Sequence, residues 1–155
     1  MIGTKDNQYY MRQALVLAQQ AYAEQEVPVG ALLIDQNGVI IGQGYNRVEQ
    51  EHTQIAHAEM AALMSAGKET GDWRFENCTL FVTLEPCTMC MAAIRLSRVA
   101  KVVYGASSFG FSFQLDSDRF IPLYNNDIFL IEAGVLKDEC SQILKSFFQR
   151  KRNAA

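Results

Sequence analysis

Residues 79–96, TLFVTLEPCTMCMAAIRL, contain the clearest indication of the architecture. Thr79–Leu84 is apolar throughout its centre, which is typical of a strand buried in a sheet. Pro86 then stands where a helix can begin, and small and apolar residues from Cys87 to Leu96 predict that helix. A buried strand that leads directly into a helix is typical of α/β proteins.

The flanking sequence repeats this alternation of strands and helices. Apolar residues at three- and four-residue steps predict helices over 6–25 and 136–152, and another helix begins at His57 and ends at Gly67. Further apolar runs predict strands, which are Val29–Ile34, Val39–Gly44, Val99–Tyr104 and Phe129–Glu132. The turn Gln36-Asn37-Gly38 joins the first two as a tight hairpin, and a loop over 105–115 precedes a weak, helix-like segment that ends at Asn126.

The strands on both sides of the hairpin turn are nearly all apolar, so we expect helices to cover both faces of the sheet. The predicted fold is therefore α/β, a three-layer α/β/α sandwich around a five-stranded mixed sheet. A chain of 155 residues with 49% apolar residues has the size and balance of one soluble domain over 1–155.

Composition also limits the location and the partners. The first residues carry charges and amides, and the apolar runs are shorter than a membrane span, which favours a cytoplasmic protein with no membrane partner. The net charge of −3 gives no bulk attraction to nucleic acid, so an RNA partner would need a local basic patch. Two of the four cysteines form a Cys-x-x-Cys pair, which favours metal binding in a reducing compartment over a disulfide framework.

Two short clusters predict a zinc site. Cys87 and Cys90 are three residues apart, so their thiols lie on one face of a helical turn and can share an ion. His57 supplies an imidazole. It is only two residues from Glu59, so the two side chains would point to opposite sides of a continuing helix, and they can converge only if the ion lies beyond the helix end. The spacing therefore predicts a site between two helix N-termini, whose dipoles favour the thiolates that zinc requires.

Three protein ligands leave the fourth position of zinc to a water, whose pKa the ion lowers from about 16 to about 7. Glu59, left uncoordinated, can carry protons from that water to a ring nitrogen and to a departing amine, which are the steps of hydrolytic deamination. The alternative is a structural site closed by a fourth ligand, for which Cys78, His52 and Cys140 are the candidates. A non-catalytic zinc domain would not depend on Glu59.

Several segments in order resemble the cytidine-deaminase-like superfamily and, more closely, the bacterial tRNA-specific adenosine deaminases. The resemblance rests on 26–31 (EVPVGA), 44–47 (GYNR), 56–60 (AHAEM), 83–87 (TLEPC), 102–106 (VVYGA) and Phe147-Phe148. The His-x-Glu and Pro-Cys-x-x-Cys signature is the one known for zinc deaminases of nucleobases. The resemblance implies a cytidine-deaminase-like fold and conversion of the wobble adenosine, position 34 of a tRNA anticodon loop, to inosine by a homodimer.

The resemblance also implies roles for individual residues. His57, Cys87 and Cys90 would bind one Zn2+ per chain, Glu59 would be the proton shuttle, and Asn46 would bond the target nucleoside. The other implied substrate contacts are Val29, Ala58, Leu84, Glu85, Pro86 and Phe148. A turn residue at the end of a strand is the alternative for Asn46.

Two features leave the RNA contacts open. Arg150, Lys151 and Arg152 close the last predicted helix, where cations bind RNA or simply complement the helix dipole. After Ala106 the family usually carries an acidic residue and a Lys/Gly-rich stretch, whereas this chain has Ser107-Ser108 followed by Phe109, Phe111 and Phe113. These rings either stack on bases or pack into a core or dimer interface, so a deaminase of free guanine, cytosine or a nucleoside is the alternative function.

Overall fold

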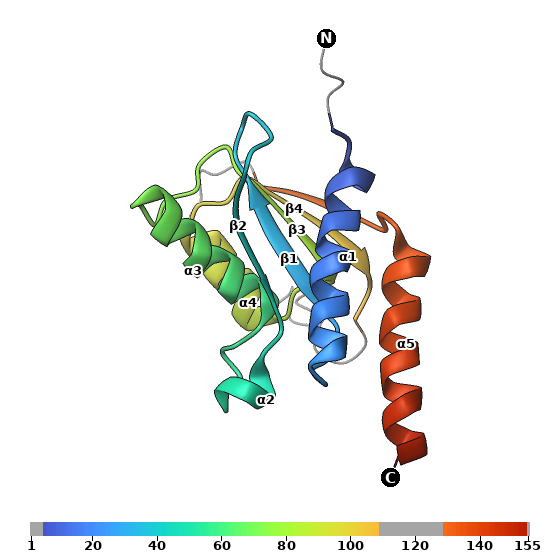
Figure 1. Cartoon of the computed structure of the whole chain (residues 1–155). Coiled ribbons are helices and arrows are strands. Elements are labelled where there is room, and N and C mark those ends of the chain that lie inside the picture. The colour runs from blue at the N-terminus through green and yellow to red at the C-terminus, as the bar shows by residue number, and fades with distance from the viewer. Residues whose placement is uncertain (1–4, 109–128, 155) are drawn as a thin grey trace.

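The computed structural model of the chain describes residues 5–108 and 129–154 (Figure 1). The loop and helix-like segment predicted before Asn126, with Phe109, Phe111 and Phe113, therefore lie almost wholly outside the described residues. Within the described part, no helix has the length and apolar character needed to cross a lipid bilayer.

A mixed sheet of five strands forms the centre of the molecule, in the order β2-β1-β3-β4-β5. The strands are β1 (Gly30–Ile34), β2 (Ile40–Tyr45), β3 (Thr79–Leu84), β4 (Lys101–Ala106) and β5 (Leu130–Ala133). β1 runs antiparallel to both β2 and β3, whereas β3, β4 and β5 run parallel to one another. The predicted five-stranded mixed sheet is confirmed.

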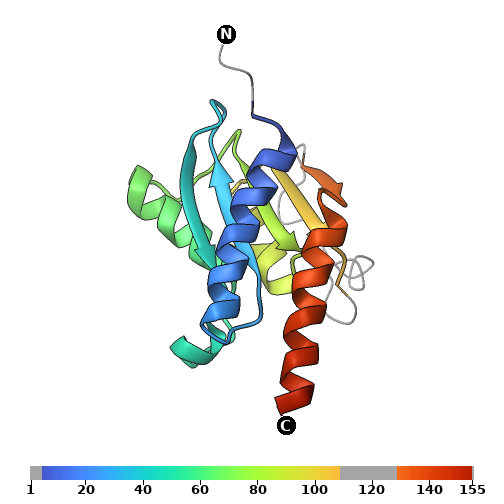
Figure 2. The same ribbon diagram turned by 45° about the vertical axis from the view of Figure 1, so that its right-hand side comes forward.

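Helices cover both faces of this sheet, which confirms the predicted three layers (Figures 1 and 2). On one face lie α1 (Asn7–Ala23) and α5 (Lys137–Ala154), whose Met11, Ala14 and Cys140 join Leu32 and Phe81 in one apolar cluster. On the other face lie α3 (Ala58–Thr70) and α4 (Thr88–Leu96). The alternation of side chains along each strand sends neighbouring residues into opposite clusters, because successive side chains of a strand point to opposite faces.

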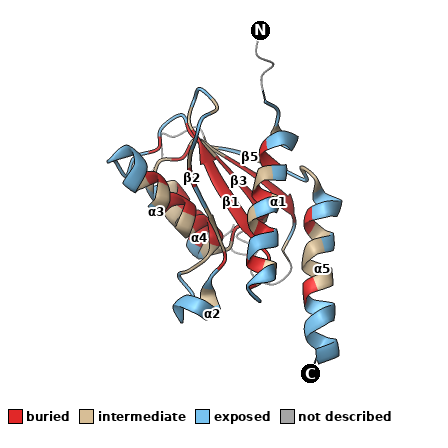
Figure 3. Cartoon of the chain, viewed as in Figure 1, coloured by how far each residue is buried: buried red, intermediate tan, exposed pale blue. Residues whose placement is uncertain are grey.

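The edge strands depart from the expectation that the sheet is covered on both faces. All five residues of β1 are buried, but β2 is largely exposed or half-buried, and Val39 just before it is 55% exposed (Figure 3). β5 at the opposite edge is also mostly exposed. An apolar run alone does not distinguish a central strand from an edge strand, because the sheet order decides which neighbours cover it.

The hairpin between β1 and β2 differs in its turn from the tight two-residue form. Of its residues, Gly38 alone has a positive φ, at 79°, while the N–H of Gly38 donates to the carbonyl of Asp35 at 3.0 Å. The Asp35 carboxylate accepts from the N–H groups of Asn37 and Val39 at 2.8 and 2.9 Å. The turn is therefore a three-residue loop that ends on a left-handed glycine and is braced by an aspartate.

The predicted end of α3 at Gly67 is wrong. The helix continues to Thr70, and Gly71 ends it with φ 71° and an N–H bond to the Gly67 carbonyl. A single interior glycine costs a helix about 1 kcal/mol, which is less than a well-packed helix gains. The helix α2 (Val48–Glu51) was not predicted, because a single turn is too short to show a helical period.

Two glycines in β2 allow α3 to lie directly on that strand. A Cβ atom added to Gly44 would lie 2.4 Å from the Cβ of Ala61, and one added to Gly42 would lie 2.4 Å from the carbonyl oxygen of Ala62. Such distances exclude any side chain at these positions unless the backbone moves. The close approach fixes the start of α3, and with it His57, against the sheet.

Candidate metal centre and substrate pocket

The strand register brings distant segments to one edge of the sheet. Gly30 at the start of β1 pairs with Tyr45 at the end of β2, and Leu84 at the end of β3 pairs with Ala106 at the end of β4. Because β1 runs opposite to the other three strands, its start lies beside their ends. The segments that follow these strand ends therefore meet at the edge where α3 and α4 begin.

His57 and Cys87 occupy equivalent positions on the two helices. Each is the N-cap residue, His57 of α3 and Cys87 of α4, and neither side chain caps its own helix. Cys90 follows in the first turn of α4 and is fully buried. The predicted position between two helix N-termini is confirmed, so the positive ends of both helix dipoles face the sulfur atoms.

The three predicted ligand side chains converge within bonding range of one ion. Their ligand atoms all lie within 4.8 Å of one another, with Nδ1 of His57 at 3.3 Å from Sγ of Cys90 and 3.7 Å from Sγ of Cys87. A tetrahedral zinc ion with ordinary bond lengths would hold a nitrogen and a sulfur about 3.5 Å apart. The arrangement therefore fits zinc.

The electrostatics of the thiols also fit a cation. A hydrogen bond between the two thiols is the main cause that lowers the pKa of Cys87 to about 4, with a further contribution from His57. The same hydrogen bond, followed by burial, raises the pKa of Cys90. One thiolate thus forms readily, but a second needs a positive charge between the sulfur atoms, which zinc provides.

Glu59 points toward the same group from the first turn of α3. Its carboxylate is 4% exposed, and Oε2 lies 3.5 Å from Sγ of Cys90. Burial raises the pKa of this carboxyl, because the charged form loses solvation. A buried carboxyl with a raised pKa takes up a proton more readily than an exposed one, which suits it to proton transfer.

The three candidates for a closing fourth ligand lie elsewhere. Cys78 is buried in the apolar cluster under α3 and α4, Cys140 lies in the cluster under α1 and α5, and exposed His52 ends α2. Among the described residues, the group that could hold a metal contains His57, Cys87 and Cys90 alone. This arrangement supports the open site over the closed structural one.

Most of the predicted substrate contacts lie around this group. Asn46 is 7% exposed, and its N–H donates to the Val29 carbonyl at 3.0 Å, so these two residues are adjacent. Ala58, Glu85 and Pro86 are buried beside the ligands, and Leu84 is half-buried. The N–H of Glu85 donates to the Ala106 carbonyl at 2.8 Å, which ties the segment before Cys87 to β4.

Phe148 and the basic residues are more distant members of the predicted site. Phe148 is 44% exposed on α5, whose contacts within the described residues are with α1, β3 and β4. Arg150 lies 5.8 Å from the centre of the Tyr22 ring, and Lys151 lies 5.3 Å from that of Phe147. The structure therefore brings neither Phe148 nor these cations into the metal group.

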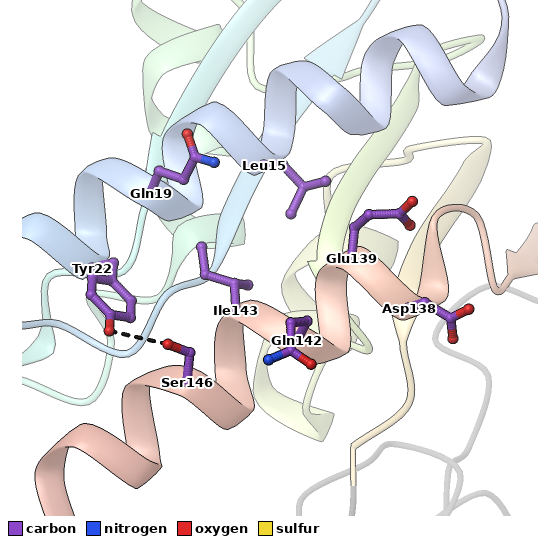
Figure 4. Close-up of a pocket in the computed structure, with 8 residues that line it drawn as sticks. All are labelled: Leu15, Gln19, Tyr22, Asp138, Glu139, Gln142, Ile143 and Ser146. Carbon is purple, nitrogen blue, oxygen red and sulfur yellow. Dashed lines mark hydrogen bonds between the residues drawn. The ribbon is translucent and has the colours of Figure 1, made fainter.

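A surface groove between α1 and α5 lies on the face of the sheet opposite α3 and α4 (Figure 4). The hydroxyls of Tyr22 and Ser146 lie 3.3 Å apart across it. Its lining residues are Leu15, Gln19, Tyr22, Asp138, Glu139, Gln142, Ile143 and Ser146. The groove contains none of the predicted site residues, and its lining includes neither histidine nor cysteine.

Comparison with known proteins identifies the family. The family described as "Cytidine and deoxycytidylate deaminase zinc-binding region" matches residues 4–106, which include the three residues of the metal group and Glu59. A tRNA-specific adenosine deaminase of Haemophilus influenzae is 44% identical over 143 residues, 92% of this chain and 83% of that protein. The chain belongs to the tRNA-specific adenosine deaminases.

Two further relatives agree with this family assignment. The tRNA-specific adenosine deaminase of Bacillus subtilis is 42% identical and covers 94% of this chain and 91% of that protein. A solved structure from work on A-to-I editing by tRNA:A34 deaminases is 32% identical, with a TM-score of 0.81 over 88% of this chain and 99% of that one. Members of the family are zinc enzymes, so the His57, Cys87 and Cys90 group matches the chemistry of the family.

Proposed function

We propose that this chain converts adenosine at the wobble position, position 34, of a tRNA anticodon to inosine by zinc-dependent hydrolytic deamination. The reaction consumes water and releases ammonia. The observation that carries the proposal is the convergence of His57, Cys87 and Cys90 with buried Glu59 at one edge of the sheet. Similarity over nearly the whole chain to proteins named as tRNA-specific adenosine deaminases supports the choice of substrate.

Three side chains would hold the metal, and each contributes an ordinary zinc donor. His57 offers Nδ1, and Cys87 and Cys90 offer sulfur atoms that helix N-termini favour as thiolates. Bound zinc supplies Lewis-acid chemistry, which lowers the pKa of a coordinated water to about 7. Burial of Cys90 excludes bulk water from one side of the group.

Glu59 would move the protons of the reaction. Its carboxylate accepts a proton from the attacking water and delivers it to the purine ring, and then transfers the second proton to the departing amine. Burial is the main cause that raises the pKa of Glu59, so this carboxylate takes up a proton more readily than an exposed one. Oε2 of Glu59 lies 3.5 Å from Sγ of Cys90, and this closeness to the ligand group supports the role.

The remaining predicted contacts would form the pocket for the base and ribose. The Asn46 side chain would bond the target nucleoside, and buried neighbours would form the walls, namely Val29, Ala58, Leu84, Glu85 and Pro86. Phe148 would contact the substrate from α5. A base must leave its stack to reach such a buried group, which favours an adenosine in a single-stranded loop.

The basic end of α5 supports contact with RNA. Arg150, Lys151 and Arg152 are exposed, and α5 extends beyond the sheet at the end where α2 lies (Figures 1 and 2). The start of α3, whose N-cap residue is His57, lies toward this same end of the sheet (Figure 1). Local cations can bind phosphates although the whole chain carries a net charge of −3. The proposed enzyme is a homodimer located in the cytoplasm.

A paired activity assay tests this function. The zinc-loaded chain is incubated with a tRNA anticodon stem-loop and, separately, with free guanine, cytosine and cytidine. We expect inosine in the RNA, little ammonia from the free compounds, and a rate on RNA that falls steeply as salt increases. Robust turnover of a free base without turnover of RNA would instead favour the alternative deaminase.

A further inference from the structure

Glu26 is a buried carboxylate outside the metal group. It lies between α1 and β1 and is 1% exposed. Its backbone N–H donates to the Ala21 carbonyl of α1 at 2.9 Å, which fixes the residue at the end of that helix. Burial of a carboxylate is costly unless hydrogen-bond donors replace the lost water.

Two backbone groups of α2 supply those donors. The N–H of Glu49 donates to Oε1 of Glu26, and the N–H of Gln50 donates to Oε2, both at 2.9 Å. The N-cap residue Arg47 provides no side-chain bond to these groups, so Glu26 caps the turn from another part of the chain. Hydrogen bonds to an ionised acceptor are stronger than neutral ones, and a negative charge is favourable at the start of a helix.

The segment that Glu26 holds carries two members of the proposed site. Asn46 precedes α2, and His57 follows it six residues after Glu51. The N–H of Arg47 donates to the Ala56 carbonyl at 2.9 Å, which closes residues 47–56 into one loop. A shift of α2 would therefore move Asn46 and His57 together.

We propose that Glu26 is a positioning residue for the deamination, and the inference rests on the function proposed above. By fixing α2 to the connection between α1 and β1, it holds the Asn46 side chain at the base and His57 at the metal. It touches neither substrate nor metal. Its effect on turnover passes through the backbone of Glu49 and Gln50.

The test compares Glu26→Gln with Glu24→Gln as a matched control. Glu24 lies two residues away and its carboxylate also accepts two hydrogen bonds, but it is exposed and accepts from the side chains of Gln50 and Tyr45 rather than from the backbone of α2. The Glu26→Gln side chain keeps the shape of glutamate, but its amide NH2 group faces one of the two backbone N–H groups that the carboxylate accepted from. We expect kcat/KM on the anticodon stem-loop to fall about 10- to 100-fold in Glu26→Gln and less than about 3-fold in Glu24→Gln, when both are compared with the natural chain at equal zinc content.

A double-mutant cycle separates positioning from general destabilisation. If Glu26 acts through Asn46, Glu26→Gln costs much less in an Asn46→Ala background than in the natural chain. Equal losses in the two backgrounds, or equal effects of the two glutamine variants, would overturn the inference while the function stands. A natural chain that is inactive on RNA rejects the proposed function, and the inference with it.

Amide hydrogen exchange of the natural chain provides a test that needs no variant. The amides of Glu49 and Gln50 lie in a short exposed turn and would exchange rapidly without the carboxylate. We expect both to be protected at least about 10-fold relative to an unstructured peptide. Exchange at the unstructured rate would overturn the inference even if Glu26→Gln did not fold.

Discussion

The cysteines divide into two classes by their surroundings. Cys87 and Cys90 lie at the start of α4 beside His57, whereas Cys78 and Cys140 lie inside apolar clusters. An isolated buried cysteine behaves as a small apolar residue and has no metal to bind.

Zinc content therefore separates the two classes. We expect Cys87→Ala to lose the ion, because two ligands do not hold zinc tightly, and Cys78→Ala to retain one ion per chain. Elemental analysis of the purified variants gives the ratio of zinc to protein. Loss of zinc in Cys78→Ala would place a fourth ligand in the site and contradict the open arrangement.

Asn46 has a role of its own to test at the same scale. Removal of its side chain takes a hydrogen bond from the substrate but leaves the metal group intact, so we expect Asn46→Ala to lower kcat/KM about 5- to 100-fold. Asn37→Ala, in the exposed hairpin turn, serves as the control. An unchanged kcat/KM in Asn46→Ala would contradict the substrate contact and favour the alternative, a structural turn residue at the end of β2.

The residues of the metal group were predictable from the sequence, whereas Glu26 was not. Cys87 and Cys90 have a spacing that itself fixes a common face, and His57 with Glu59 completes a recognised signature. Glu26 accepts from backbone N–H groups 23 and 24 residues away. Every residue except proline has such a group, so the sequence does not show which ones a buried carboxylate bonds. The only sequence signal for Glu26 was its position as a charged residue shortly before an apolar strand.

At the scale of elements, the long helices and central strands followed their apolar periods closely. The predicted strand over 79–84 matches β3, and the helix predicted from Asp6 begins at Asn7, because the Asp6 carboxylate accepts from the Tyr9 N–H at 2.8 Å. The short turn α2 and the true end of α3 were missed, because both depend on contacts outside the local sequence.

Alanine substitution at two glycines, one in β2 and one in α3, is expected to change the stability in opposite directions. Gly44→Ala would force the new methyl group against the backbone of α3, and we expect a loss of about 1–3 kcal/mol in stability. Gly67→Ala lies inside α3, where a Cβ would have its nearest neighbour at 3.7 Å, and we expect a gain of about 0.5–1 kcal/mol.

Urea unfolding at a fixed zinc concentration measures both changes, because bound ligand shifts apparent stability. Tolerance of Gly44→Ala would contradict the close packing of α3 on β2, and destabilisation by Gly67→Ala would contradict the open surroundings of that position.

For the whole molecule, the site depends on sheet order. Val29, Asn46 and Cys87 lie far apart in the sequence and reach the same edge of the sheet because β1 runs antiparallel to β2 and β3. The alternation of strands and helices predicted three layers, but no local pattern fixed the order β2-β1-β3-β4-β5. One domain over 1–155 and the homodimer stay predictions.

Sedimentation equilibrium tests the homodimer directly. We expect a mass near twice 17.4 kDa at micromolar concentration, independent of RNA. The outer surface of α3 and α4 carries exposed Met64, Met89 and Leu96, which an association between copies would cover. A mass equal to one chain would reject the dimer and leave the zinc chemistry intact.

The rate of inosine formation at position 34 of an anticodon stem-loop, compared between the natural chain and Glu59→Gln at equal zinc content, tests the account most directly. We predict multiple turnovers by the natural chain and a rate about 100- to 10,000-fold lower in the variant, because the metal stays bound while the proton carrier is lost. The exposed substitution Glu69→Gln on the same helix controls for the loss of charge. Inosine formation at the same rate by Glu59→Gln, or none by the zinc-loaded natural chain, would contradict the account.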